Sequence, residues 1–283
     1  MVTDVAGSSS PTDYGDEVGP LLSLRGISKS FGAVRALEDV DLDIPAGQVT
    51  ALVGDNGAGK STLIKTISGI WAPSAGEILW NGKPADIHTP RDADARGIAT
   101  VYQDLALCDN LDIVQNMYLG HEELRWGLLD ENTMENTARQ VLSDLSVTTV
   151  QSIRQPVGSL SGGQRQAVAV ARAVMREAKL VILDEPTAAL GVSQTAQVLD
   201  LITTLASRGI AVLVVSHNLN DVFAVANRIA VLHLGHMVSS GPVTDYDTQS
   251  VVELITTGTQ NNHAANPGAE ARADNTDSQG RDH

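Results

Sequence analysis

Alternating hydrophobic and polar positions mark a strand in the first part of the chain. Val40, Leu42 and Ile44 alternate with aspartates, a period of two that buries one face of a strand and wets the other. A second strand is predicted over residues 77–80, and the Asn-Gly that follows tolerates the positive φ angles of a tight hairpin turn. These segments predict antiparallel β structure.

Three further runs are apolar at almost every position. They cover residues 49–53, 180–183 and 210–215. Strands that helices cover on both faces have this pattern, so the runs predict a central parallel sheet.

Helical spacing occurs between these runs. Residues 60–68 and 164–175 each place apolar side chains on one face. From 105 to 156 the pattern is mainly helical, with its clearest apolar stripe from Met134 to Leu145. The expected fold is therefore an α/β body with an antiparallel β part and a helical insertion over about 105–163.

Charge separates this body from the two ends of the chain. The sequence has 283 residues, 42% of them hydrophobic, and a formal net charge of −15. Residues 1–20 hold four acids and no base, and residues 258–283 hold four acids and two arginines. Neither end has apolar periodicity, so we predict disordered tails around a folded body over 21–257. An interaction role is the alternative for the tails.

Composition also excludes several classes of function. An acidic chain lacks the excess of Lys and Arg that binds phosphate backbones, so we expect no nucleic-acid partner. Cys108, the only cysteine, allows neither an internal disulfide nor a cysteine-based zinc site and fits a reducing cytoplasm. With no run of about 18 apolar residues and no signal sequence, we expect a chain that neither spans a membrane nor is secreted.

Residues 54–61 match the phosphate-loop pattern G-x-x-x-x-G-K-[ST], between the predicted strand 49–53 and the helix from residue 60. Backbone N–H groups and the helix N-terminus would face phosphate oxygens. Lys60 would neutralise terminal phosphate charge, and Ser61 would offer its hydroxyl to Mg²⁺. A strand–helix turn without a ligand is the alternative. The predicted ATP-binding residues here are Gly54, Asp55, Asn56, Gly57, Ala58, Gly59, Lys60, Ser61 and Thr62.

Two acids follow the buried run 180–183. Asp184 is predicted to hold the Mg²⁺ shell, and Glu185 to polarise the water that attacks the γ-phosphate. A solvated turn is the alternative, and the neighbouring phosphate loop weakens it.

The segment Leu160-Ser161-Gly162-Gly163-Gln164 resembles the signature sequence of the ATP-binding-cassette (ABC) ATPases. With the phosphate loop and the Asp-Glu pair in this order, the resemblance extends over about residues 22–255. It implies a P-loop NTPase with a RecA-like parallel-sheet core, an antiparallel β subdomain and a helical signature subdomain. It also implies two cassettes head to tail, with ATP and Mg²⁺ between them. Ser161, Gly162, Gly163 and Gln164 would face the ATP site of the opposing cassette.

The resemblance implies roles for three separate residues. Phe31 stands where the family has an aromatic that stacks on adenine; an ordinary packed phenylalanine is the alternative. Gln103 matches the glutamine that reaches the metal and the attacking water, so Ser61, Gln103 and Asp184 are the expected metal residues. His217 matches the histidine that contacts the γ-phosphate, although a lone histidine at a strand end is usually incidental.

One position departs from the family pattern. The family usually has an aspartate that touches the opposing cassette where this chain has Gly191. We expect altered coupling between the two ATP sites and unaltered nucleotide binding.

Residues 101–120 resemble the ATPases of bacterial monosaccharide importers, and most closely the fructose-type subunits with a single cassette. One set of motifs then implies a homodimer, peripheral on the cytoplasmic face of the membrane. Its partners would be permease subunits and, indirectly, an extracytoplasmic sugar-binding protein.

Two other classes remain as alternatives. A soluble cassette ATPase of translation or repair usually has two cassettes, long coiled insertions or basic surfaces, none of which this sequence has. A nucleotide-binding regulator with little hydrolysis would lack the catalytic acid or the histidine, whereas Glu185 and His217 are both present.

Overall fold

The computed structural model describes residues 19–147 and 150–259. Apart from residues 19–20 and 258–259, the tails predicted over 1–20 and 258–283 lie outside the described residues, so their disorder stays a prediction. The boundaries 21–257 and 105–163 likewise stay predictions.

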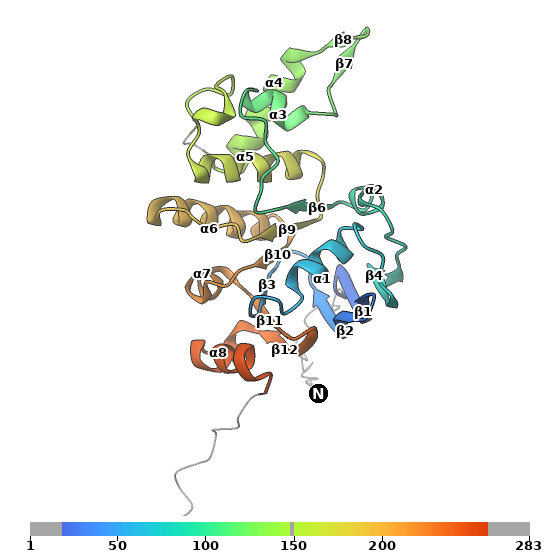
Figure 1. The fold of residues 1–283 in the computed structure, drawn as a ribbon. Coiled ribbons are helices and arrows are strands. Elements are labelled where there is room, and N and C mark those ends of the chain that lie inside the picture. The colour runs from blue at the N-terminus through green and yellow to red at the C-terminus, as the bar shows by residue number, and fades with distance from the viewer. Residues whose placement is uncertain (1–18, 148–149, 260–283) are drawn as a thin grey trace, which may run out of the picture.

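A six-stranded sheet lies at the centre of the molecule (Figure 1). All neighbouring strands in it are parallel except β11 and β12, the pair at one edge of the sheet. The three apolar runs form β3, β10 and β9, which lie side by side, and every residue of β3 and β10 is buried. The predicted parallel core is confirmed. In spatial order the strands are β12 (His236–Pro242), β11 (Arg228–His233), β3 (Val49–Val53), β10 (Ala211–Val215), β9 (Leu180–Asp184) and β6 (Ile98–Val101).

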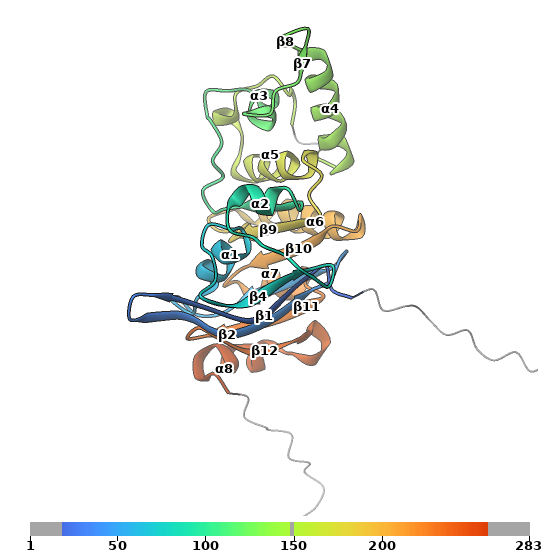
Figure 2. The same cartoon turned by 90° about the vertical axis from the view of Figure 1, so that its right-hand side faces the viewer.

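A second, antiparallel sheet lies beside the first (Figure 2). Its strands are, in order, β2 (Val34–Ile44), β1 (Leu22–Phe31), β4 (Ala75–Trp80) and β5 (Lys83–Pro84). Val40, Leu42 and Ile44 are buried, as the alternation predicts. Asn81 and Gly82, at φ 51° and 71°, form the predicted turn between β4 and β5.

Eight α-helices cover and extend the core sheet in the described part of the chain. They are α1 (Lys60–Ile67), α2 (Pro90–Asp94), α3 (Ile113–Tyr118), α4 (Glu131–Asp144), α5 (Gly162–Met175), α6 (Val192–Ser207), α7 (Leu219–Val225) and α8 (Thr248–Thr257). Short 3₁₀ turns cover Val157–Ser159 and Val243–Asp245. The helix predicted from residue 164 begins two residues earlier, because Ser161 and Gln164 form a capping box at its N-terminus.

The segment between β6 and α5 forms a separate end of the molecule (Figure 1). Met134, Ala138 and Leu142 of α4 are buried there, which confirms the predicted stripe. This segment also contains a hairpin that the sequence does not predict, β7 (Leu124–Arg125) with β8 (Leu128–Leu129). Its apolar residues are exposed, so no alternation of buried and wet positions marks it.

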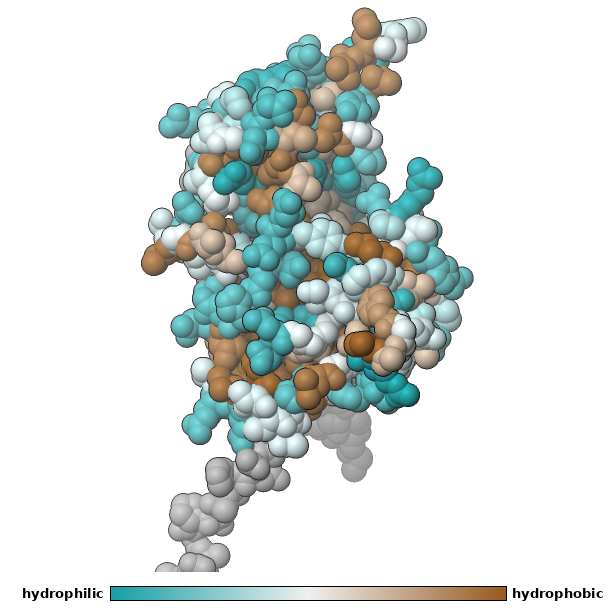
Figure 3. Space-filling view, viewed as in Figure 1, coloured by the Kyte–Doolittle hydropathy of each residue, from teal (hydrophilic) through white to brown (hydrophobic). Residues whose placement is uncertain are grey.

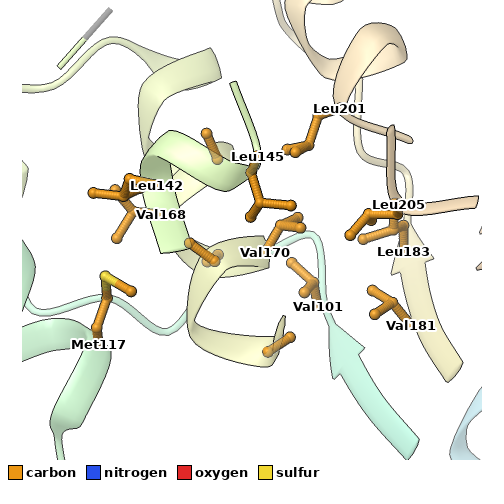
Figure 4. Packing of buried hydrophobic residues seen from close by; sticks show 14 of the residues in the cluster. Val101, Met117, Leu142, Leu145, Val168, Val170, Val181, Leu183, Leu201 and Leu205 are labelled. Atoms are coloured by element: carbon orange, nitrogen blue, oxygen red, sulfur yellow. The ribbon is translucent and has the colours of Figure 1, made fainter. Parts of the chain in front are cut away.

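One hydrophobic cluster ties this end to the sheet (Figure 4). Burial of a large aliphatic side chain stabilises by roughly 1.5–3 kcal/mol, so these contacts hold α3, α4 and α5 firmly on the core. The cluster includes Val101 of β6, Val181 and Leu183 of β9, Leu201 and Leu205 of α6, Val168 and Val170 of α5, Met117 of α3, Leu142 of α4 and Leu145.

Candidate functional site

The phosphate-loop sequence forms a turn between β3 and α1 that requires glycine. Gly54 has φ 159°, and a Cβ there would overlap the carbonyl oxygen of Leu232. Gly59 has φ 107°, and a Cβ there would lie 2.7 Å from the carbonyl oxygen of Ala36. Because Gly59 is also the N-cap of α1 and has no side chain to bond the first N–H groups, those groups are oriented to bind an anion.

Lys60 closes over this loop. Its Nζ donates to the carbonyl oxygen of Gly54 at 2.7 Å and to that of Asp55 at 3.0 Å. Burial lowers the pKa of Lys60, while the carboxylates of Glu185, Asp55 and Asp184 act in the opposite direction. The ammonium group therefore lies among acidic groups at the mouth of the loop.

A cavity of about 570 Å³ brings most of the predicted site residues together. Gly54 and Ala58 do not line this cavity; the Gly54 carbonyl holds Lys60, and Ala58 is buried. Residues from four separate segments of the sequence thus line one cavity. The predicted residues that line it are Asp55, Asn56, Gly57, Gly59, Lys60, Ser61, Thr62, Gln103, Asp184, Glu185 and His217.

The two acids differ in their surroundings. Burial raises the pKa of the Asp184 carboxyl, and the adjacent Glu185 raises it further, against the opposing charges of Lys60 and Lys65. Negative charge is therefore crowded at the end of β9. A bound cation would relieve this crowding.

Glu185 is held in an unusual backbone conformation. Its φ is 51°, in the left-handed region that costs a non-glycine residue about 1–2 kcal/mol. Its N–H donates to the carbonyl of Val215 at 2.9 Å, which ties it to β10. Strain of this kind concentrates where a side chain must point in one direction.

His217 contacts that side chain directly. Its Nδ1 lies 2.8 Å from Oε2 of Glu185. A carboxylate only accepts hydrogen bonds, so Nδ1 carries the proton and Nε2 remains on the far side of the ring. The predicted histidine and the predicted catalytic acid thus form one hydrogen-bonded pair.

The predicted metal residues line the same cavity. Ser61, Gln103 and Asp184 offer a hydroxyl, an amide oxygen and a carboxylate, which are the hard oxygen donors that Mg²⁺ prefers beside substrate phosphates. Within residues 19–147 and 150–259, no cluster of three or more His, Cys, Asp or Glu is arranged to hold a metal ion. A mixed oxygen set that is completed by phosphates fits this composition.

The signature residues lie elsewhere. Ser161 Oγ accepts from the N–H of Gln164 at 3.3 Å, and Gln164 Oε1 accepts from the N–H of Ser161 at 2.9 Å. A Cβ on Gly162 would lie 2.6 Å from Leu190 Cδ2, and one on Gly163 would lie 3.2 Å from Gln194 Cβ. The glycines therefore have a packing role that the sequence did not predict. None of the four signature residues lines the phosphate cavity of its own chain.

Phe31 is also outside the cavity lining. It is 41% exposed and packs edge-on against Trp71, with ring centroids 4.7 Å apart at 72°. Its partner across the β1–β2 pairing is Val34, which does line the cavity, so Phe31 lies next to its rim.

Sequence reasoning missed several lining residues. They are Val34, Arg35, Ala36, Ala188, Leu234 and Gly235. Asp39 at φ 52° interrupts the alternation of β2, so the sequence pattern does not predict that the strand begins at Val34. Leu234 and Gly235 come from the β11–β12 turn, which only tertiary contacts bring to the loop.

Known proteins resemble this chain along most of its length. A family described as ABC transporter matches residues 37–188. A fructose import ATP-binding protein from Rhizobium meliloti is 46% identical over 244 residues, covering 84% of this chain and 94% of that protein. A xylose/arabinose import ATP-binding protein from Sulfolobus acidocaldarius is 43% identical, covering 83% and 94%.

A solved structure agrees with these matches. The crystal structure of a nucleotide-free ATP-binding cassette from an ABC transporter has a TM-score of 0.72 at 26% identity, covering 83% of this chain and 98% of the other. Among the described helices, none is both long and apolar enough to span a membrane.

Proposed function

This chain belongs to the ABC transporter family, and from that premise we propose that it is the ATPase subunit of a bacterial monosaccharide importer. Its nucleotide-binding and ATP-hydrolysing character follows from the family. The observation that carries the site assignment is the single cavity shared by the phosphate loop, Gln103, Asp184, Glu185 and His217.

Each group in the cavity has a chemical task. The loop N–H groups and Lys60 bind phosphate oxygens, and Glu185 accepts a proton from the attacking water. His217 donates to the Glu185 carboxylate through Nδ1, and a proton on Nε2 as well would let it donate to a γ-phosphate oxygen. Ser61, Gln103 and Asp184 would hold Mg²⁺, which would neutralise phosphate charge. Phe31, at the rim beside Val34, would contact adenine.

The active unit is proposed to be a dimer. The signature residues 161–164 do not line the cavity of their own chain, which supports a role for them at the ATP site of a second copy. ATP binding would close the two cassettes, and hydrolysis would reopen them, a ligand-biased shift between two states. Gly191 is expected to loosen coupling between the two sites.

A groove of about 590 Å³ between α2, β6 and α5 is the proposed docking place for the permease. Tyr102 lines this groove and the next residue, Gln103, lines the ATP cavity, so one short segment links the two. The subunit would then lie peripherally on the cytoplasmic face of the membrane. The extracytoplasmic sugar-binding protein would act on it only through the permease, and no nucleic acid is involved.

Fructose is the first candidate for the sugar. The fructose import relative and the xylose/arabinose import relative have similar identities of 46% and 43% to this chain. In an importer of this design the sugar contacts the binding protein and the permease, so the residues of this chain do not select it.

A deletion strain tests the proposal. We expect loss of high-affinity uptake of one labelled sugar from a panel of fructose, xylose, ribose and galactose. Wild-type protein should restore uptake, and Glu185→Gln should not. Unchanged uptake of all four sugars, in a strain without a second ATPase of this kind, would refute sugar import. A membrane subunit that co-purifies with the chain would separate transport from a soluble or regulatory role.

A further inference from the structure

The β7–β8 hairpin presents a cluster of large apolar side chains to water. Leu124, Trp126, Leu128 and Leu129 are 64%, 94%, 75% and 54% exposed. The hairpin forms the upper right tip of the molecule in Figure 1, and the same tip is coloured hydrophobic in Figure 3. Exposed apolar side chains gathered in one place indicate a surface that a partner covers.

The turn of this hairpin is unfavourable for the residue that it carries. Trp126 and Gly127 have φ 56° and 81°, the geometry of a two-residue turn that favours Asn, Asp or Gly at the first position. The positive φ angle disfavours a tryptophan at this position, and its side chain is exposed to solvent. At 94% exposed, its side chain gains almost no burial within the chain that would offset this backbone cost.

The hairpin is held in place at its base. The N–H of Asp130 donates to the carbonyl of Glu123 at 2.8 Å, and Asp130 caps α4 by accepting from Thr133 N–H at 3.2 Å. The N–H of Gly120 donates to Glu122 at 2.9 Å. The base of the hairpin is therefore tied to the start of α4.

The charges around the tip restrict the partner. Glu122 and Glu123 are exposed, Asp130 is half-buried, and Arg125 is the one basic residue between positions 122 and 131. Glu131 is also exposed, but it already pairs with Arg154 at 3.0 Å, so Glu122, Glu123 and Asp130 form the acidic rim. An acidic rim repels an anionic lipid surface. It attracts the cytoplasmic loops of membrane proteins, because these loops carry an excess of Lys and Arg.

The hairpin follows part of the lining of the proposed permease groove along the chain. Gly120 and His121 line that groove, and β7 begins three residues later. In Figure 1 the hairpin and α2, which forms the opposite wall, lie on the same side of the molecule. A partner seated in the groove would thus have a second segment within reach of the hairpin.

We propose that the β7–β8 hairpin is a second docking surface for the membrane subunit, which receives a cytoplasmic loop bearing an apolar residue flanked by Lys or Arg. This inference rests on the proposed function and adds a contact outside the groove. The apolar tip supplies affinity, and the acidic rim selects the basic loop.

Trp126→Asn tests the contact. Asparagine suits the turn, so the variant should fold at least as well as the wild type while it loses the most exposed apolar side chain of the hairpin. Binding to the co-purifying membrane subunit, reconstituted in nanodiscs, should weaken at least tenfold, and ATP turnover of the isolated ATPase should not change. Val252→Asn, which removes a 47% exposed apolar side chain from α8, is the matched control and should bind as the wild type.

Glu123→Gln tests the charge. Raising the salt concentration should weaken wild-type binding, and the variant should bind more weakly at low salt with a shallower salt dependence. Equal affinity of Trp126→Asn and wild type overturns the inference while leaving sugar import standing. So does binding of the isolated chain to anionic vesicles through Trp126, or a loss of self-association in Trp126→Asn. Failure of the wild type to bind any membrane subunit overturns both proposals.

Discussion

Glu185 combines a left-handed backbone, a main-chain bond to β10 and a hydrogen bond to His217. Together these fix where the carboxylate points. Glu185→Gln fills the same space but does not accept a proton, so we expect retained ATP affinity and a loss of at least about 10²-fold in kcat. Single-turnover hydrolysis and equilibrium nucleotide binding are the measurements. Wild-type turnover in this variant would remove Glu185 from its role. Lys60→Ala, the contrasting variant, should weaken ATP binding itself.

Asp184 yields a stability prediction. Its pKa is raised in the folded chain, so the folded form holds a proton at pH values where the unfolded form has released it. The ionised carboxylate therefore destabilises the fold at neutral pH, and this cost disappears as the pH falls below the unfolded value of about 4.

Asp184→Asn should consequently raise Tm at pH 7–8, with a difference from wild type that shrinks toward pH 4, while ATP turnover falls. Asp86→Asn, an exposed change of equal charge, is the control for net charge. Thermal scans across pH measure both. A Tm gain in Asp184→Asn that is independent of pH, or equal to that of Asp86→Asn, would contradict the argument from burial.

At the scale of single elements, α6 begins without a side-chain cap. Gly191 is its N-cap at φ −75° and ψ 162°, and a Cβ there would meet nothing within 4 Å. Gly191→Asp should cap the helix and reduce unfolded-chain entropy, raising stability by about 1 kcal/mol. Gly191→Ala gives the entropy part without the cap. Chemical denaturation of the wild type and both variants measures the free energy of unfolding. An aspartate variant no more stable than the alanine variant would exclude capping.

The elements also divide into those that the sequence predicts and those that it does not. β3, β9 and β10 are predictable because burial on both faces demands apolar residues at almost every position. The β7–β8 hairpin is not, since its apolar side chains face outward and its turn holds a tryptophan. The true start of α5 was hidden by Gly162 and Gly163, which are poor helix formers, although Ser161 and Gln164 carry the capping signal.

On the scale of the whole molecule, the contiguous motifs of the site are predictable and its outer walls are not. The phosphate loop needs small residues in one short segment, and that need is visible in the sequence. Gly235 reaches the site because its N–H donates to the carbonyl of Ala58 and its carbonyl accepts from Glu38 N–H, both at 2.9 Å. Such contacts between distant segments leave no local pattern.

The separation of the signature from the cavity predicts an ATP-dependent dimer. With ATP, Glu185→Gln should sediment as a dimer. Adding Ser161→Asp should prevent this, because aspartate still caps α5 but would place a carboxylate against the γ-phosphate of the second chain. Ser161→Asn, neutral and also a good cap, is the matched control and should dimerise better. A dimer indifferent to the charge at position 161 would place the interface elsewhere.

Coupling of ATP hydrolysis to sugar movement is the central claim, and uptake into proteoliposomes measures it directly. The purified ATPase, its co-purifying membrane subunit and the sugar-binding protein would be reconstituted with ATP on the side of the ATPase. We predict accumulation of one labelled monosaccharide that requires ATP and the wild-type chain, and that stops with Glu185→Gln although the complex still assembles. Equal accumulation with wild type and Glu185→Gln, or ATP hydrolysis without movement of any sugar in the panel, would contradict the account.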